Sequence, residues 1–356
     1  MEQVLAALCQ STRDRVDNEV LAFSGSAQTT RDVVDGIPVT RLGSASPARS
    51  TPIAPAMTQA LRRSTADLIV LHEPNPWGLL SCALVRPRQP TAVYFHSEVV
   101  RPALQYALFY HPMARAVYSR AARIIVASPP MAEHARALQP YRDRIAVIPY
   151  GIDPAAWVRT PDVERRVGEI RASRPGMPLV VFAGRFVRYK GCDVLLQALK
   201  EVQAAAVFAG DGPLKNELTA RAASLGLSGR VRFPGEVSPE ELLALYHAAD
   251  VFVLPSITHA EAFGFVQIEA MACGTPVVST HVRSGVPWVN QHGVTGLVVE
   301  PGDVVALRRA LTSLLADTVA RERMGVAAQH RVASEFTLAK MGQRASELFE
   351  ELAAHG

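Results

Sequence analysis

Short apolar runs of four or five residues alternate along the chain with longer segments whose apolar positions recur every three or four residues. This alternation of strands and amphipathic helices is typical of βαβ units, in which a parallel sheet carries helices on both faces. Runs without polar residues, such as Leu179–Ala183, favour strands that are buried on both faces. The pattern therefore predicts an α/β protein with parallel, doubly wound sheets.

A length of 356 residues favours two such domains rather than one core. Pro and Gly interrupt the pattern at Pro149–Pro154, which predicts a hinge there. We therefore expect an N-terminal domain over 1–150, a C-terminal domain over 151–335 and a final helix over 336–356 that packs back on the first domain. The predicted strands are Asp67–Leu71, Thr91–Phe95, Arg123–Ala127 and Ile145–Ile148 in the first half, and Leu179–Ala183, Ala206–Ala209, Val231–Phe233, Val251–Leu254, Pro276–Ser279 and Gly296–Val298 in the second.

The beginning of the chain departs from this pattern. Apolar residues at positions 1, 4, 5 and 8 predict a helix from the first residue, whereas a doubly wound domain normally opens with a strand. Two interpretations remain open: a fold that begins with a helix, or a domain that lacks its first strand.

Composition narrows the class of protein. No apolar run approaches the roughly 18–20 residues that span a bilayer, no secretory leader is recognisable, and four widely spaced cysteines favour reduced thiols in a cytoplasmic protein over a zinc or disulfide framework. The first 150 residues hold 16 Lys and Arg against 11 Asp and Glu, and the remainder 21 against 22. The excess of positive charge in the first half has two interpretations. It forms a solvated basic face, or it forms a surface that contacts anionic lipid headgroups or a phosphate-bearing acceptor. Without a Lys/Arg run that carries aromatics, nucleic-acid binding is disfavoured.

The segment Glu261–Pro276 carries the strongest chemical signal. It follows the predicted strand Val251–Leu254 through a loop with Gly264 and enters a helix near Phe265 that also carries Glu269. Ligands of open α/β sheets bind at the carboxyl ends of strands, where helix N-termini favour anions. We expect the two glutamates to face one cleft, one near a sugar and the other near a ribose.

Two more strand ends carry related signals. Arg185 and Lys190 follow strand Leu179–Ala183, where they are placed to grip a diphosphate without a metal, and no Asp-x-Asp pair is present. Gly210-Asp211-Gly212-Pro213 follows the next strand and, taken singly, indicates a tight turn. Neither a Gly-x-Gly-x-x-Gly nor a Gly-Lys-Ser/Thr loop occurs.

Together these motifs resemble the retaining GT-B glycosyltransferases of family four. The resemblance rests on Gly184-Arg185 with Lys190-Gly191, on Gly210–Pro213 and Val231–Gly235, and on Glu261 with Glu269 and Gly274–Val278. In the first half, His72–Pro76 and Tyr94–Arg101 resemble the branch that builds bacterial surface polysaccharides, often as mannosyltransferases.

The resemblance implies a fold of two Rossmann-like domains that face a cleft, and a role for each matching residue. Arg185 and Lys190 would bind the donor diphosphate, Glu269 the ribose hydroxyls, and Glu261 the transferred sugar. His96 would face that sugar from the N-terminal domain. Further donor contacts would come from Gly184, Asp211, Phe263, Gly264 and Phe265, and acceptor contacts from His72, Glu73 and Asn75.

Relatives usually begin with a strand and a glycine-rich loop before the helix that opens this chain. Met1-Glu2 falls where that loop would end, which predicts a translation start assigned too late or a truncated gene. An immediate stop codon upstream of Met1 would contradict a misassigned start.

The resulting hypothesis is a cytoplasmic, metal-independent hexosyltransferase with neither a resident cofactor nor a nucleic-acid partner. A peripheral position at the inner face of the membrane is part of this hypothesis. The enzyme would move mannose from GDP-mannose to a glycan or lipid-linked acceptor. A UDP-hexose transferase of the same fold and an inactive nucleotide-sugar-binding protein are the alternatives. A phosphorylase would carry a lysine that binds pyridoxal, and it is disfavoured because none of the four lysines lies in a setting that suggests this role. A dehydrogenase or epimerase is disfavoured because the glycine-rich dinucleotide loop is missing.

Overall fold

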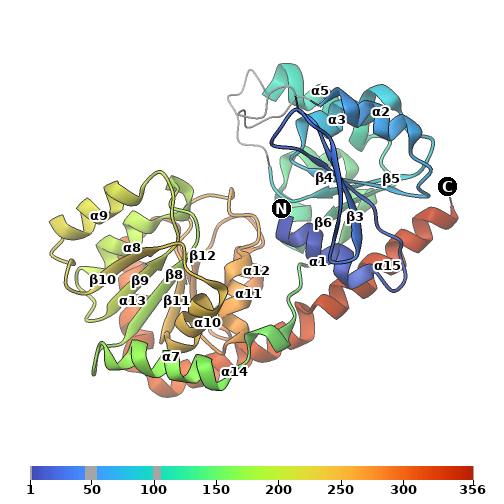
Figure 1. Cartoon of the computed structure of the whole chain (residues 1–356). Helices are drawn as coiled ribbons and strands as arrows, with labels where there is room; N and C mark the ends of the chain where they lie inside the picture. The colour runs from blue at the N-terminus through green and yellow to red at the C-terminus, as the bar shows by residue number, and fades with distance from the viewer. Residues whose placement is uncertain (1, 45–53, 99–105, 356) are drawn as a thin grey trace. The chain divides into compact units, whose positions relative to one another are not determined.

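The computed structural model describes residues 2–44, 54–98 and 106–355. The chain divides into two compact units. Unit 1 contains residues 1–151 and 338–356, and unit 2 contains residues 152–337. Figure 1 shows the elements of both units.

Unit 2 is built on one continuous parallel sheet of six strands in the order β10-β9-β8-β11-β12-β13. The two central strands, β8 and β11, carry no polar residue and are buried along their whole length, as a parallel sheet covered on both faces requires. The strands are β8 (Leu179–Ala183), β9 (Ala205–Ala209), β10 (Val231–Gly235), β11 (Val251–Leu254), β12 (Val277–Thr280) and β13 (Gly296–Val299).

Helices cover both faces of this sheet. Leu195, Leu196 and Leu199 of α8 pack with leucines of α13 into one core against the strands. On the other side α10 packs against α7, and α11 against α14. The helical elements of unit 2 are η3 (Pro154–Trp157), α7 (Pro161–Ala172), η4 (Arg188–Lys190), α8 (Cys192–Leu199), α9 (Lys215–Ser224), α10 (Pro239–Ala248), α11 (Phe265–Ala272), α12 (Val286–Val289), α13 (Val304–Ala316) and α14 (Thr318–Glu335).

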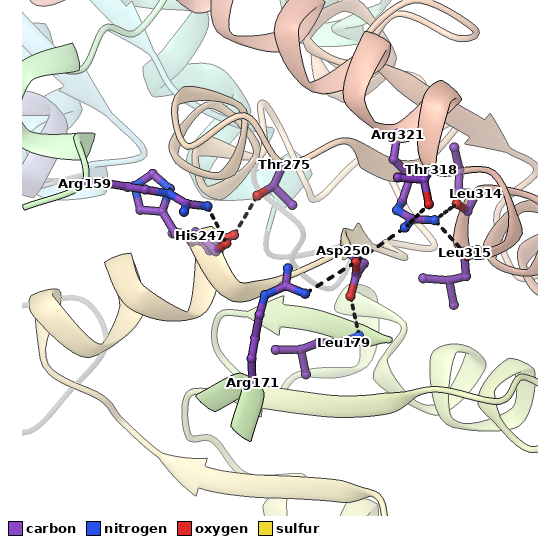
Figure 2. Close-up of polar contacts among 11 residues, drawn as sticks. Arg159, Arg171, Leu179, His247, Asp250, Thr275, Leu314, Leu315, Thr318 and Arg321 are labelled. Atoms are coloured by element: carbon purple, nitrogen blue, oxygen red, sulfur yellow. Dashed lines mark hydrogen bonds and ion pairs between the residues drawn. The ribbon is translucent and has the colours of Figure 1, made fainter. Parts of the chain in front are cut away.

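The amino-end edge of the unit 2 sheet is held by charged side chains (Figure 2). Asp250, which directly precedes β11, accepts a hydrogen bond from the amide of Leu179 at 2.8 Å and lies 3.9 and 3.7 Å from Arg171 and Arg321. Arg321 also donates to the carbonyl of Leu314 at the end of α13. These contacts join three helices, α7, α13 and α14, to strands β8 and β11, at the edge opposite to the strand ends that carry the candidate motifs.

In unit 1 the strands form two separate sheets, a three-stranded one in the order β1-β3-β2 and a four-stranded parallel one in the order β4-β5-β6-β7. β1 pairs in parallel with β3, whereas β2 and β3 form an antiparallel hairpin. The strands are β1 (Val20–Phe23), β2 (Thr30–Val34), β3 (Ile37–Leu42), β4 (Ile69–Glu73), β5 (Thr91–Phe95), β6 (Arg123–Val126) and β7 (Ile145–Val147).

The helices of unit 1 lie in two groups. α15 packs against α1, although the two are far apart in sequence, and α2 packs against α3 (Figure 1). Gly342 of α15 allows this close approach, since a Cβ there would lie 2.2 Å from the carbonyl oxygen of Ser11. The helical elements are α1 (Glu2–Thr12), α2 (Pro55–Arg63), α3 (Pro76–Val85), η1 (Tyr106–Tyr110), α5 (His111–Tyr118), α6 (Pro129–His134), η2 (Arg136–Arg144) and α15 (Leu338–Ala354).

Comparison with the expected elements shows where the sequence pattern was sufficient. Every predicted strand is present, with bounds shifted by two residues or fewer, and the helix predicted at the start is α1, although Met1 lies outside the described residues. Strands β1, β2 and β3 were not predicted. The hairpin carries a signal that could have found it, since Asp35-Gly36 lies between apolar residues and both residues have positive φ, as a two-residue hairpin turn requires.

Candidate functional site

The carboxyl ends of β8, β9 and β11 meet at one edge of the unit 2 sheet, where glycines let the loops approach closely. A Cβ at Gly191 would lie 2.0 Å from the carbonyl oxygen of Pro255, and one at Gly210 would lie 2.2 Å from that of Gly184. Both glycines have positive φ, at 67° and 132°. The loops after β8, β9 and β11 are therefore packed into one constellation.

Within this constellation Lys190 and Glu261 form an ion pair. The Nζ atom of Lys190 lies 2.6 Å from Oε2 of Glu261, and only 11% and 10% of their side chains are exposed. The hydroxyl of Ser256 donates to the same carboxylate oxygen at 3.1 Å. A pair this deeply buried holds both charges in place, because removal of either partner would leave the other unpaired in a poorly solvated position. Lys190 and the loop that precedes α11 are thus brought together.

Arg185 lies in the same loop region, but it is exposed. Its charge acts on Tyr189: burial raises the pKa of that phenol, and the cations of Lys190 and Arg185 oppose the rise. The loop therefore presents one buried and one exposed cation close to the same aromatic ring.

The start of α11 is shaped by Gly264, which adopts the left-handed conformation with a φ of 74°. A Cβ there would lie 2.6 Å from the side-chain amide of Gln267 and 2.6 Å from Leu254. Phe263 is buried, whereas Phe265 is half-buried. The first amides of a helix have no acceptor within it, so the N-terminus of α11 is suited to an anionic or hydroxyl-bearing ligand.

Glu269 lies one turn inside α11, eight positions after Glu261. Its carboxylate accepts a hydrogen bond from the hydroxyl of Tyr246 at 2.8 Å. Burial raises the pKa of Glu269 to about 7, and the hydrogen bond from Tyr246 opposes that rise. Near neutral pH this carboxyl group therefore exists in both protonation states, and it can accept from or donate to a ligand hydroxyl.

Gly184 and Asp211 belong to the turns beside this site. The amide of Gly184 donates to Ala209 at 2.9 Å, and the carbonyl of Asp211 accepts from Phe186 at 2.8 Å. The Asp211 carboxylate is exposed and pairs with Lys215 at 2.7 Å, and this hydrogen bond lowers its pKa. Asp211 therefore lies at the rim of the constellation, with a partner of its own.

A second group of candidate residues lies at the carboxyl ends of β4 and β5 in unit 1. Nδ1 of His72 lies 2.9 Å from Nε2 of His96, and Nδ1 of His96 lies 2.6 Å from the hydroxyl of Tyr150. The rings of His72, Tyr94 and His96 stack on one another. Burial lowers the pKa of His72 to about 4 and that of His96 to about 3, the latter also through its histidine neighbour. Both imidazoles are therefore neutral at physiological pH.

The remaining acceptor candidates have structural contacts. Glu73 is fully buried, and its carboxyl group accepts a hydrogen bond from the hydroxyl of Tyr110. Burial raises the pKa of Glu73 to about 8. The side chain of Asn75 caps α3 by accepting from the amide of Gly78 at 2.8 Å. Of the segment Tyr94–Arg101, positions 99–101 lie outside the described residues.

Sequence reasoning missed the residues that hold the candidate groups in place. Tyr246 binds Glu269, Ser256 binds Glu261 and Tyr150 binds His96. Only Ser256 carried a signal, since it follows β11 by two positions. Tyr246 and Tyr150 lie 23 and 54 positions from their partners, so that no local spacing relates them.

No helix in residues 2–44, 54–98 and 106–355 is long and apolar enough to cross a bilayer. The same residues contain no group of three or more His, Cys, Asp or Glu side chains placed to hold a metal ion. The four cysteines are buried free thiols.

Comparisons with known proteins match both halves of the chain. Residues 1–156 match the model of glycosyltransferase family 4, and residues 167–331 match that of glycosyl transferases group 1. The D-rhamnosyltransferase WbpZ of Pseudomonas aeruginosa is 33% identical over 95% of this chain and 88% of its own length. The O-antigen chain mannosyltransferase C of Escherichia coli is 29% identical over 95% and 90%.

Solved structures agree on the fold. Sucrose-phosphate synthase from Thermosynechococcus elongatus superposes with a TM-score of 0.79 at 23% identity, over 99% of this chain and 92% of that one. Anabaena HepE, solved with UDP and glucose, gives 0.77 at 22% identity, over 98% and 95%. The fold is thus GT-B, with two Rossmann-like units. On these matches, the chain belongs to glycosyltransferase family four and is a retaining hexosyltransferase.

Proposed function

We propose that unit 2 binds a nucleotide-sugar donor at the carboxyl ends of β8 and β11, with Lys190 and Arg185 on the diphosphate. The observation that carries this proposal is the buried ion pair between Lys190 and Glu261, which places a cation 2.6 Å from the loop that leads into α11. A diphosphate bound here would gain charge-assisted hydrogen bonds, each worth about 1.5–3 kcal/mol.

In the proposed reaction an acceptor hydroxyl attacks the anomeric carbon on the face from which the diphosphate departs, so that the configuration is retained. The bond between the anomeric carbon and the phosphate oxygen breaks, and its electron pair goes to the diphosphate. The acceptor proton passes to the departing phosphate oxygen. Lys190 and Arg185 stabilise the negative charge that develops there, with no metal required.

The other candidate residues receive roles that match their surroundings. Glu269, whose pKa lies near neutrality, binds the ribose hydroxyls, and Glu261 binds the transferred sugar. We propose further donor contacts from Gly184, Phe263, Gly264 and Phe265 and, at the rim, from Asp211. A contact of His96 with the sugar, and acceptor contacts of His72, Glu73 and Asn75, stay predictions.

We propose surface-polysaccharide synthesis as the process and GDP-mannose as the donor. The support comes from the names of the relatives: a D-rhamnosyltransferase, an O-antigen mannosyltransferase and a GDP-mannose-dependent phosphatidylinositol mannoside mannosyltransferase of Mycolicibacterium smegmatis, 36% identical over 56% of this chain. D-Rhamnose is mannose without its 6-hydroxyl, so the two sugars differ at one group. The acceptor is a glycan or a lipid-linked glycan, and a peripheral location at the cytoplasmic face of the membrane stays a prediction.

The diphosphate assignment is tested with Lys190→Ala and Arg185→Ala, with Lys200→Ala as the control. Lys200 is an exposed cation at the end of α8, so its loss should leave turnover unchanged. We expect each site variant to lower kcat/KM by roughly 10²–10³-fold, as the loss of one transition-state donor does elsewhere. Wild-type rates in both site variants would exclude the assignment.

The donor is tested with GDP-mannose, GDP-D-rhamnose, UDP-glucose and UDP-galactose, each by thermal shift and by turnover of radiolabelled sugar. Stabilisation and turnover with GDP-mannose alone are expected. Turnover with GDP-D-rhamnose instead would reassign the sugar, and turnover with a UDP-hexose would reassign the base. Stabilisation without turnover by any donor would indicate a binding protein and contradict the proposed transfer.

A further inference from the structure

Tyr246 of α10 forms a buried hydrogen bond to Glu269 of α11, and the proposed function gives this tyrosine no role. Its side chain is fully buried, and its hydroxyl donates to Oε2 of Glu269 at 2.8 Å. Burial holds the pKa of Tyr246 well above its ordinary value, so the hydroxyl stays protonated and is the donor. Because buried polar groups usually find a partner, this bond alone does not distinguish a core contact from a functional one.

The surroundings of Tyr246 fix the position of its hydroxyl. The ring lies edge-on against Phe252 of β11, with centroids 5.5 Å apart, and 5.8 Å from the ring of Trp157 in η3. The backbone carbonyl of Tyr246 accepts a hydrogen bond from the hydroxyl of Thr275 at 2.6 Å (Figure 2). A side chain that is packed in this way can hold a neighbouring functional group in one orientation.

The carboxyl group of Glu269 has acceptor capacity that the fold leaves unused. Among residues 2–44, 54–98 and 106–355, the hydroxyl of Tyr246 is the only hydrogen-bond partner of this group. A carboxylate offers about four acceptor positions on two oxygens, so a single bond to Oε2 leaves Oε1 open to a ligand. The side chain of Glu269 is half-buried rather than enclosed. A carboxyl group with a purely structural role would be bonded at both oxygens.

The other titratable groups around α11 are neutral or have partners elsewhere. On α11 itself, burial raises the pKa of the Cys273 thiol, which therefore carries no charge. Arg159, which follows η3, bonds to the ring and the carbonyl of His247 (Figure 2). β11 and β12 contain no titratable residue. The three arginines of α14 donate to backbone carbonyls, namely Arg321 to Leu314, Arg323 to Gly293 and Arg331 to Val289.

From these contacts we propose that Tyr246 is a positioning residue for the nucleotide: its hydroxyl holds one oxygen of Glu269 so that the other accepts a hydrogen bond from the ribose diol. The inference rests on the proposed role of Glu269 in ribose binding. It makes the selection of ribose over 2′-deoxyribose depend on a residue that does not touch the nucleotide. Because the hydroxyl also favours the charged carboxylate, which accepts hydrogen bonds more strongly, Tyr246 sets the pH at which this selection develops.

The test measures how strongly the chain prefers a ribonucleotide to its 2′-deoxy form, as the ratio of the two dissociation constants between about pH 5.5 and 9. GDP with 2′-deoxy-GDP and UDP with 2′-deoxy-UDP are compared by calorimetry, and the pair with the tighter ribonucleotide is followed. The phosphates of both members titrate alike, so their contribution cancels in the ratio. The parent chain should prefer the ribonucleotide roughly tenfold or more, and the preference should rise with pH around a midpoint of about 7.

Tyr246→Phe keeps the ring and its packing but removes the donor. The preference at pH 7 should fall roughly threefold or more, and the midpoint should move up by roughly one pH unit, because the bond that lowers the pKa of Glu269 is lost. Thr275→Val is the matched control. It removes one bond to the carbonyl of Tyr246, which still accepts from Ala249 at 3.2 Å, so the preference and the midpoint should stay unchanged. Glu269→Gln should give a small preference that does not vary with pH.

The outcomes separate this inference from the proposed function. If Glu269→Gln lowers the preference while Tyr246→Phe keeps the preference and the midpoint of the parent chain, only the inference is overturned. If Glu269→Gln keeps the preference of the parent chain, the ribose role of Glu269 and the inference are both wrong. A loss in Thr275→Val as large as that in Tyr246→Phe would show a general loosening of α10 and would contradict the positioning role.

Discussion

The sheets of the two units differ in continuity. In unit 2 six parallel strands form one sheet, and a single core covers one of its faces. In unit 1 the strands are divided into sheets of three and four, with a cavity of about 1410 Å³ between β1 and β4. The same alternation of strands and helices therefore gives a closed layer in one unit and an interrupted one in the other.

The comparison shows that helices can pack in layers around a sheet that is not continuous. α1 and α15 remain packed on each other, and so do α2 and α3, because these helix pairs contact one another directly. Beside this gap in the sheet, Leu5 and Leu8 of α1 and Leu61 of α2 border the cavity. The two units should therefore respond differently to the same perturbation.

The largest expected difference between the units is in the loss of unfolding free energy when one leucine side chain in each is shortened to alanine. Leu196 of α8 is completely buried in the unit 2 core, whereas Leu8 of α1 borders the cavity of unit 1. Leu196→Ala should lower the free energy of unfolding of unit 2 by about 3–5 kcal/mol, because it opens a new cavity in close packing. Leu8→Ala should cost unit 1 about 1–2 kcal/mol, mainly the transfer term, because its surroundings already contain a void.

Hydrogen exchange resolved by peptide measures the opening free energy of each unit separately, which a single melting curve of two units cannot do. Each variant serves as the control for the unit that it does not change. Equal losses in the two units would contradict the contrast and show that the packing around Leu8 is as close as that around Leu196.

The second contrast concerns one buried carboxyl group in each unit. Burial raises the pKa of Glu73 to about 8 and that of Glu269 to about 7, from an ordinary value of 4.5. As the pH rises above 4.5, the unfolded chain releases these protons while the folded chain retains them. Stability therefore falls by about 1.4 kcal/mol per pH unit and per group until the folded pKa is reached.

Glu73→Gln and Glu269→Gln keep the side-chain shape and an acceptor for the partner tyrosine. Between pH 5 and 8, the free energy of unfolding of the parent chain should fall by roughly 2–4 kcal/mol more than that of Glu73→Gln. Compared with Glu269→Gln, the additional fall should be smaller and complete near pH 7. Urea unfolding at each pH measures both differences. Differences that do not vary with pH would show that these carboxyl groups titrate as exposed ones.

The smallest contrast lies within unit 2, between the two edges of its sheet. Asp250 holds the amino-end edge through Leu179, Arg171 and Arg321 and lies away from the candidate site. Asp250→Ala should lower the free energy of unfolding by about 1–3 kcal/mol, because it leaves a buried amide unpaired. Asp250→Asn keeps that acceptor and should cost about 1 kcal/mol or less. Donor affinity at 25 °C should be unchanged in both, and a clear loss would link the two edges.

Much of the fold followed from local pattern. β8 and β11 are apolar throughout, and their type and place were predicted because burial on both faces leaves no room for alternation. β2 was missed because its five residues are exposed, so no apolar run marks it. The turn residues Asp35 and Gly36 were the better signal for that hairpin.

For the candidate site, the sequence indicated the motif residues but not their partners. Glu261 and Lys190 were identified separately from their strand-end positions, and their ion pair spans 71 positions of chain. The neighbours of these groups include Tyr246, which lies 23 positions from Glu269, and Tyr150, which lies 54 positions from His96. Such environments arise only from packing.

By itself, the sequence determined that strands and helices alternate, that loops at strand ends carry Arg185, Lys190 and the two glutamates, and that the chain opens with a helix. These features depend on residue type and spacing over a few turns. Only the tertiary structure decided that Lys190 meets Glu261, that His96 is enclosed and neutral, and that β1 and β4 stay apart with a cavity between them. The reason is physical: contacts and voids depend on which distant surfaces meet, and the energy of each group is set by its neighbours in space.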